Sequence, residues 1–251
     1  ISTKDPNSTI SNIVSFFSNF QISGLGVGSF GPLVLNPAST EYGLLVAESK
    51  KGWKGVNVIK ALSIINSNLV IDTDVNAAAI GEYRYGAGQN SETLVYVTVG
   101  TGIGVGVLLD GKPHVGNFHL EIGHMLIPNS DDFQGVCEIH GNCWEGLASG
   151  PSIESKWGIA ASELSNSHEA WEKEADLLAK GLVNIISNHS PDKIILGGGV
   201  MSQKHLFPMI RSNIEKLWNN YTPLVLLSDL ISEPGLGVDS GIVGALSLIS
   251  N

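Results

Sequence analysis

Apolar positions along the chain follow two periods that alternate from one end to the other. Apolar residues at helical spacing predict helices at residues 7–20, 56–65, 74–83, 170–188, 206–219 and 240–249. Short apolar or alternating runs predict strands at residues 22–27, 69–73, 93–99, 103–109, 193–196 and 224–228. Residues 121–146 follow neither period and are expected to be loop-like. Strands alternating with helices indicate an α/β fold with a central sheet.

The alternation breaks clearly at residues 86–91, where the sequence reads Gly-Ala-Gly-Gln-Asn-Ser. We therefore expect two lobes that share a cleft, residues 1–88 and residues 89–251. A chain of 251 residues is long enough for two such lobes, each with a core of its own.

Composition narrows the possible functions. Hydrophobic residues make up 43% of the chain and charged residues only 15%, which excludes a disordered protein. The formal net charge of −10 leaves no overall basic footprint for nucleic acid, and no apolar run is long enough for a membrane span. Two cysteines are too few for a disulfide framework. We expect a soluble, cytoplasmic protein that binds neither nucleic acid nor membrane.

Glycine-rich turns follow several of the predicted strands. Thr101 lies in a Gly-Thr-Gly turn between two strands, and Gly197, Gly198 and Gly199 follow a third. Backbone N–H groups without side chains around them suit phosphate oxygens, so both turns are candidate phosphate sites. A tight hairpin and an ordinary strand-to-helix turn are the alternatives.

Asp74 follows a predicted strand and opens a predicted helix. In α/β folds the carboxyl ends of parallel strands face the ligand crevice, so this carboxylate could accept a proton from a substrate hydroxyl. A helix N-cap would explain an aspartate at this position equally well.

Four potential metal ligands lie close together in the loop-like segment: His124, Cys137, His140 and Cys143. A Cys₂His₂ set fills the tetrahedral shell of a structural zinc site, and two free thiols with stray histidines are the alternative. Residues 128–135 have no core-forming period, so we expect that this loop is ordered only by a bound metal. His114 and His119 are expected either at the surface or directly behind the residues that contact a ligand.

Taken in order, the motifs resemble one family. They are Asp-Thr-Asp-Val-Asn-Ala-Ala-Ala from Asp72, Thr-Val-Gly-Thr-Gly-Ile-Gly-Val-Gly from Thr98, Glu-Ile-Gly-His from Glu121, Cys-x-x-His-x-x-Cys-x-Glu from Cys137 and Leu-Gly-Gly-Gly-Val from Leu196. The chain resembles the ROK family of sugar kinases, and most closely its bacterial zinc-containing fructokinases. The resemblance implies an actin-like ATPase (ribonuclease H-like) fold and phosphoryl transfer from MgATP to a hexose.

The resemblance also implies roles for individual residues. Asp74 would be the catalytic base, and the sugar would be contacted by Thr73, Glu121, His124 and Glu145. ATP would be bound by Thr101, Pro151, Gly197, Gly198, Gly199, Val200 and Met201. Zn²⁺ would be held by His124, Cys137, His140 and Cys143, and the protein would be a homodimer.

The family pattern leaves three matters open. Glucokinase and N-acetylmannosamine kinase activities are alternatives to fructose phosphorylation. So is a non-catalytic sugar-sensing regulator, although the presence of Asp74 favours a kinase, because a sensor needs no base. We also expect that the hairpin with the phosphate loop that usually opens the family's fold would precede Ile1.

Overall fold

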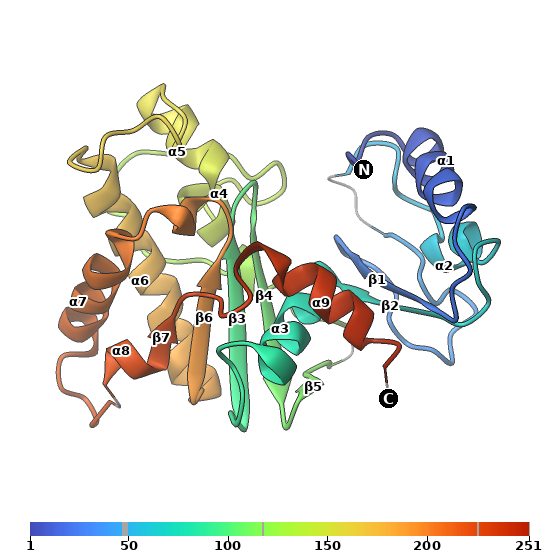
Figure 1. The fold of residues 1–251 in the computed structure, drawn as a ribbon. Coiled ribbons are helices and arrows are strands. Elements are labelled where there is room, and N and C mark those ends of the chain that lie inside the picture. Colours follow the sequence, from blue (N-terminus) through green and yellow to red (C-terminus); the bar gives the residue numbers. More distant parts are fainter. Residues whose placement is uncertain (47–49, 117, 225, 251) are drawn as a thin grey trace.

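The computed structural model describes residues 1–46, 50–116, 118–224 and 226–250. Two separate sheets form its framework (Figure 1). A parallel pair contains β1 (Leu25–Ser29) and β2 (Leu69–Thr73), and a five-stranded sheet has the order β5-β4-β3-β6-β7. Its strands are β3 (Thr93–Val99), β4 (Ile103–Leu109), β5 (Lys112–Pro113), β6 (Lys193–Gly197) and β7 (Ile231–Ser232). The expected α/β class is confirmed.

The five-stranded sheet is mixed and covered on both faces. β3 pairs antiparallel with β4 and parallel with β6. Alternate residues of β3 point to opposite faces: Val95 and Val97 join the large core, and Leu94 and Tyr96 join a smaller one. The large core is completed by α4 (Trp144–Ala148), α5 (Gly150–Trp157), α6 (Ala170–His189) and α7 (Leu206–Trp218). A sheet buried on both faces explains the long apolar runs of the sequence.

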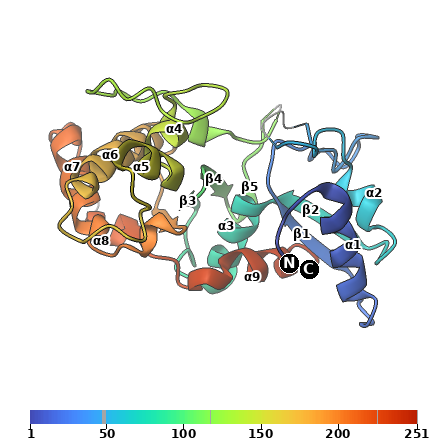
Figure 2. The ribbon, with the colours of Figure 1, turned by 90° about the horizontal axis from the view of Figure 1, so that it is seen from above.

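The two-stranded sheet has its own core and its own helices. Leu25 and Ile71 pack with residues of the connecting segment, and α1 (Pro6–Phe17) and α2 (Val58–Leu62) lie against this core (Figure 2). A parallel pair needs a crossover between its strands, and residues 30–68 supply it. The part of the chain before α3 therefore has a core of its own.

Two helices lie between the sheets, α3 (Asp74–Tyr85) and α9 (Ser240–Ser247). α3 packs against β3 and β4 on one side and against β1 on the other, while α9 contacts α3 and β1. The two helices approach closely because two glycines at their contact have no side chain. A Cβ on Gly244 would collide with the Ala77 carbonyl, and one on Gly81 would lie 2.6 Å from Ser240 O. The last helix of the chain thus returns to the elements that carry Asp74.

The sequence prediction is wrong at residues 224–228, where a strand was expected. Val225 lies outside the described residues, and α8 (Leu227–Leu230) begins within the predicted strand. Leu227 and Leu230 lie on one helical face and are both buried, so a helix satisfies the apolar run. The strand that pairs with β6 is β7, which starts three residues beyond the predicted end.

The remaining differences concern boundaries and short elements. β1 starts three residues later than predicted, and α2 is shorter than predicted at both ends. The loop-like segment contains a 3₁₀ turn, η1 (Ile122–His124), and reaches the start of α4. Two further 3₁₀ turns are η2 (Val200–Ser202) and η3 (Gly237–Asp239). Within the described residues, no helix combines the length and apolarity that a membrane crossing requires.

Candidate active site and metal centre

Asp74 lies where β2 ends and α3 begins. Thr73 is the N-cap of α3, and its hydroxyl accepts a hydrogen bond from Asn76 N at 3.1 Å. Thr73 therefore caps the helix, and Asp74 lies in its first turn. The alternative that Asp74 is itself the N-cap is wrong. Burial raises the pKa of Asp74, while a hydrogen bond from Val75 N and the charge of Lys50 oppose the shift. A carboxylate with a raised pKa is a stronger base than one at the ordinary value.

Glu121 and Glu145 share the same region as Asp74. Glu145 belongs to the first turn of α4, and its Oε2 accepts a hydrogen bond from Ile103 N at 3.0 Å. Burial raises the pKa of Glu121 to about 7, and the negative charges of Glu145 and Asp74 add to the shift. Residues from three distant parts of the chain therefore form one acidic cluster.

The predicted nucleotide residues gather at one end of the five-stranded sheet. The Thr101 turn follows β3 and the Gly197–Gly199 turn follows β6, and these two strands are parallel neighbours. Gly150, which opens α5 just before Pro151, donates its N–H to Gly100 O at 2.7 Å. Gly198 has a φ of +93°, and a Cβ there would lie 2.6 Å from Val99 N. Only glycine suits this turn.

Two of the predicted nucleotide residues use their side chains elsewhere. Val200 and Met201 are 3% and 2% exposed and pack in the large core. Their backbone remains at the turn, while Thr101 is exposed beside it. Because Ile103 N binds Glu145, the Thr101 turn also adjoins the acidic cluster.

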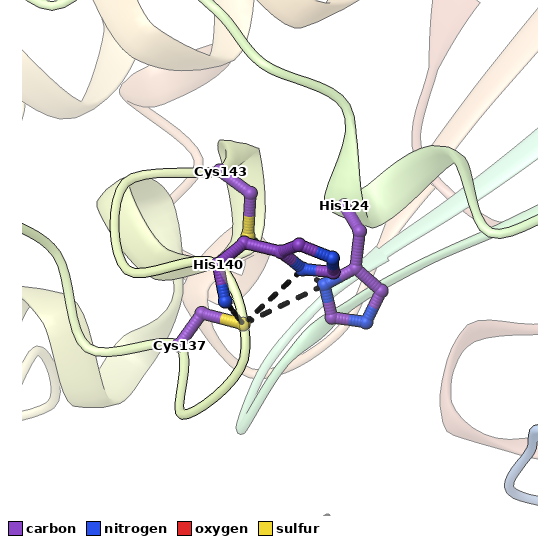
Figure 3. Close-up of side chains that lie close together, drawn as sticks. All are labelled: His124, Cys137, His140 and Cys143. Atoms are coloured by element: carbon purple, nitrogen blue, oxygen red, sulfur yellow. Dashed lines mark hydrogen bonds between the residues drawn. The ribbon is translucent and has the colours of Figure 1, made fainter.

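The four predicted metal ligands come together (Figure 3). His124 Nδ1 lies 3.7 Å from Cys137 Sγ and 3.5 Å from Cys143 Sγ, and His140 Nδ1 lies 3.7 Å from Cys137 Sγ. All four ligand atoms lie within 4.8 Å of one another. A tetrahedral zinc with Zn–S of about 2.3 Å and Zn–N of about 2.0–2.1 Å separates sulfur from nitrogen by about 3.6 Å. The donor atoms fit such an ion.

Local structure brings the ligands into place. Cys137 and Gly141 exchange two backbone hydrogen bonds around a tight turn, in which Gly141 has a φ of +63°. Cys143 is the N-cap of α4, and its Sγ accepts from Gly146 N at 3.4 Å. His124 ends η1, so only two residues separate it from Glu121.

The loop around the ligands has anchors that the sequence did not indicate. Asp131 forms ion pairs with Lys156 of α5 and with Lys173 of α6, the latter at 3.0 Å. Phe133 packs against the large core. The expectation that this loop has no reason to order without a metal is therefore wrong.

His119 lies behind Glu121, which is one of the two places expected for it, and its bond to Leu33 was not foreseen. It is 7% exposed, and its Nε2 accepts a hydrogen bond from Leu33 N at 3.1 Å. Its Nδ1 lies 3.5 Å from Glu121 Oε1. The only signal in the sequence is its position two residues before Glu121.

Acidic residues beside glycine turns, at the carboxyl ends of parallel strands, are typical of α/β enzymes that transfer groups from nucleotides. Comparison with known proteins identifies the family: the chain belongs to the ROK family, whose model matches residues 2–251.

Individual relatives agree with this assignment. The fructokinase of Pediococcus pentosaceus is 38% identical over 99% of the chain and 87% of its own length. The fructokinase of Zymomonas mobilis is 36% identical over 99% of the chain and 86% of its own length. The structure of a ROK family glucokinase from Streptomyces griseus, in complex with glucose and AMPPNP, matches with a TM-score of 0.76 at 20% identity, covering 98% of this chain and 88% of that one. The actin-like ATPase fold expected from the motifs is confirmed.

Proposed function

We propose that this ROK family member transfers the γ-phosphoryl group of ATP to a hexose, with D-fructose as the favoured acceptor and fructose 6-phosphate as the product. The two relatives named above with 38% and 36% identity to the chain are fructokinases. The observation that carries the proposal is the acidic cluster of Asp74, Glu121 and Glu145 beside the Thr101 turn. One carboxylate serves as base, and the other two accept hydrogen bonds from sugar hydroxyls.

Asp74 would remove the proton from the attacking hydroxyl. A hydrogen bond from Val75 N at 2.8 Å holds the carboxylate in one orientation, and its raised pKa makes it a better proton acceptor. Glu121, Glu145 and His124 would orient the sugar, and Thr73 would contribute a further contact from the cap of α3. His124 presents Nδ1 to the thiols, so its Nε2 is the atom available for the sugar.

The glycine turns would hold the nucleotide. Thr101, Pro151 and the segment Gly197–Met201 lie at one end of β3 and β6, where phosphate oxygens would accept hydrogen bonds from backbone N–H groups of the glycine turns. Mg²⁺ would arrive with ATP and neutralise charge on the transferred group. Phosphoryl transfer depends mainly on positioning and charge stabilisation, which suits a site with a single base.

Replacement of the base tests this proposal. Asp74→Asn keeps the shape of the side chain but cannot accept the proton, so kcat should fall by about 10²–10⁴-fold while the dissociation constant for the sugar changes little. ADP release measured over a panel of hexoses gives kcat and identifies the acceptor. Asp110→Asn, at an exposed turn, is the matched control. A variant that keeps more than about a tenth of the wild-type kcat excludes Asp74 as the base.

We also infer that the Cys₂His₂ cluster binds one structural Zn²⁺. The sulfur–nitrogen separations of 3.5–3.7 Å support this, as does a ligand set that fills all four positions. Elemental analysis of protein purified without chelator should find one zinc per chain, and Cys143→Ser should lose it. His114→Gln, an exposed histidine outside the cluster, should keep the zinc. Wild-type protein without zinc would contradict the inference.

The division into lobes is also part of the proposal. A boundary at residue 88 places α3 and the small sheet in the first lobe, and α9 then packs on it from the second lobe. The homodimer and the cytoplasmic location stay predictions. Sedimentation of the purified protein tests the first of these.

A further inference from the structure

His119 joins two segments that are distant in the sequence. It lies in the loop between β5 and η1, and its side chain is only 3% exposed. Nε2 accepts the hydrogen bond of Leu33 N, from the crossover of the small sheet, across 86 positions of sequence. The approach depends on Gly31, where a Cβ would lie 2.9 Å from His119 Cε1. The ring is thus buried where the two segments meet.

This contact fixes the tautomer of the ring. Leu33 N–H is a donor, so Nε2 must be the unprotonated nitrogen, and the proton of the neutral ring lies on Nδ1. Burial lowers the pKa of His119, which keeps the ring neutral. Nδ1 forms a hydrogen bond with Leu120 O at 3.5 Å, and Glu121 Oε1 lies at the same distance from Nδ1 as a second acceptor within reach.

We propose that His119 is the positioning residue of the sugar site, which holds the Glu121 carboxylate through Nδ1–H and is itself held by Leu33. The inference rests on the proposed function, because it gives Glu121 its orientation toward the sugar. The Glu121 side chain is 41% exposed. With Oε1 directed to His119, Glu121 presents its remaining acceptor positions to the hydroxyls of a hexose.

The chemistry of the ring suits this role. A neutral imidazole donates with one nitrogen and accepts with the other, so a single rigid side chain satisfies a backbone N–H and a carboxylate at once. An amide side chain reaches only one of the two partners, because the amide nitrogen of Asn lies near the place of Nδ1 and the amide oxygen of Gln lies near the place of Nε2. Two amide variants therefore separate the two contacts.

The variants are His119→Gln and His119→Asn, measured in the purified protein with the hexose that proves active. Gln reaches the Leu33 N–H but leaves Glu121 without a donor, so the sugar KM should rise by about tenfold with the ATP KM unchanged. Asn keeps a donor near the place of Nδ1 but loses Leu33, so the sugar KM should change less and the thermal midpoint should fall. His114→Gln, at the exposed histidine, should behave as wild type.

A double-mutant cycle shows whether His119 acts through Glu121. Glu121→Gln alone should raise the sugar KM, and adding His119→Gln to it should change KM by less than about twofold. If Glu121→Gln raises KM and His119→Gln leaves it at the wild-type value, the inference is overturned while the proposed function stands. Additive effects in the double variant overturn it as well. If Glu121→Gln itself has no effect, the assigned role of Glu121 fails, and the inference fails with it.

Discussion

Two buried glutamates differ in their hydrogen-bond partners. Glu82 is fully buried and accepts four hydrogen bonds, from Ala87 N, Gly235 N, Leu236 N and Ser240 Oγ. Glu174, on α6, is 2% exposed, and its Oε1 has no partner among the described residues. A buried carboxylate without partners favours the protonated form.

Burial raises the pKa of Glu174 well above its ordinary value, and this gives a pH-dependent stability. The folded state binds the proton more tightly than the unfolded state. The contribution of Glu174 to the free energy of unfolding is therefore highest below the unfolded pKa of about 4.3 and falls by about 1.4 kcal/mol per pH unit up to the folded pKa. Glu174→Met removes the ionisable group, so at pH 8 it should be more stable than wild type.

Urea unfolding at pH 5, 6, 7 and 8 measures this difference. The advantage of Glu174→Met should shrink as the pH falls. Glu172→Gln, an exposed position on the same helix, should follow the wild-type curve. Parallel curves for Glu174→Met and wild type across this range would show that Glu174 does not titrate as its burial requires.

At the scale of elements, Glu82 anchors the end of the chain. It lies in α3, and its four donors come from the loop after α3 and from the segment that leads into α9. These bonds bring α9 back against the helix that carries Asp74. All four partners donate, two to each carboxylate oxygen, so both oxygens serve as acceptors.

Glu82→Gln should therefore destabilise the fold. The amide nitrogen would face two donors, so two hydrogen bonds to a charged group are lost, at a cost of about 3 kcal/mol in the free energy of unfolding. Urea unfolding at pH 7 tests this. Glu92→Gln, at an exposed position, should change the free energy by less than about 0.5 kcal/mol. Equal stability of both variants would contradict an anchoring role.

Elements with a clear period were predictable, and those without were not. β2, β3 and β4 have the predicted bounds, and α6 and α7 begin at the predicted residue. At residues 224–230 the apolar run is too short for its period to distinguish a strand from a helix. The structure forms a helix there, which buries Leu227 and Leu230 on one face. The 3₁₀ turns depend on local hydrogen bonds that no periodicity records.

At the scale of the whole molecule, motifs indicated the candidate residues of the proposed site but not all of their contacts. Asp74, Glu121 and Glu145 were recognisable because each lies in a motif of fixed order. The bond from Leu33 N to His119 was not, since a backbone N–H has no side-chain signature. The ion pairs of Asp131 were also hidden, because exposed charges in a loop resemble any solvated surface.

The Cys₂His₂ cluster lies next to two of the proposed sugar contacts, Glu121 and Glu145. His124 N donates to Glu121 O at 3.0 Å, and Cys143 is the N-cap of the helix that carries Glu145. An ion bound to both His124 and Cys143 therefore fixes the positions of two sugar contacts relative to each other. The Asp131 ion pairs hold the outer part of the loop independently of the metal.

Chelation of the metal should therefore affect sugar binding more than folding. We expect the sugar KM to rise by about tenfold, which corresponds to about one hydrogen bond to a charged group, while the ATP KM stays within about twofold. The thermal midpoint should fall only slightly, because Asp131 and Phe133 still hold the loop. Steady-state kinetics before and after chelation, with zinc added back, measure each effect, and chelator should not alter Cys143→Ser further. An unchanged sugar KM after complete removal of zinc would separate the metal from the substrate site, whereas a raised KM that zinc restores would show that the ion positions the side chains that bind the sugar.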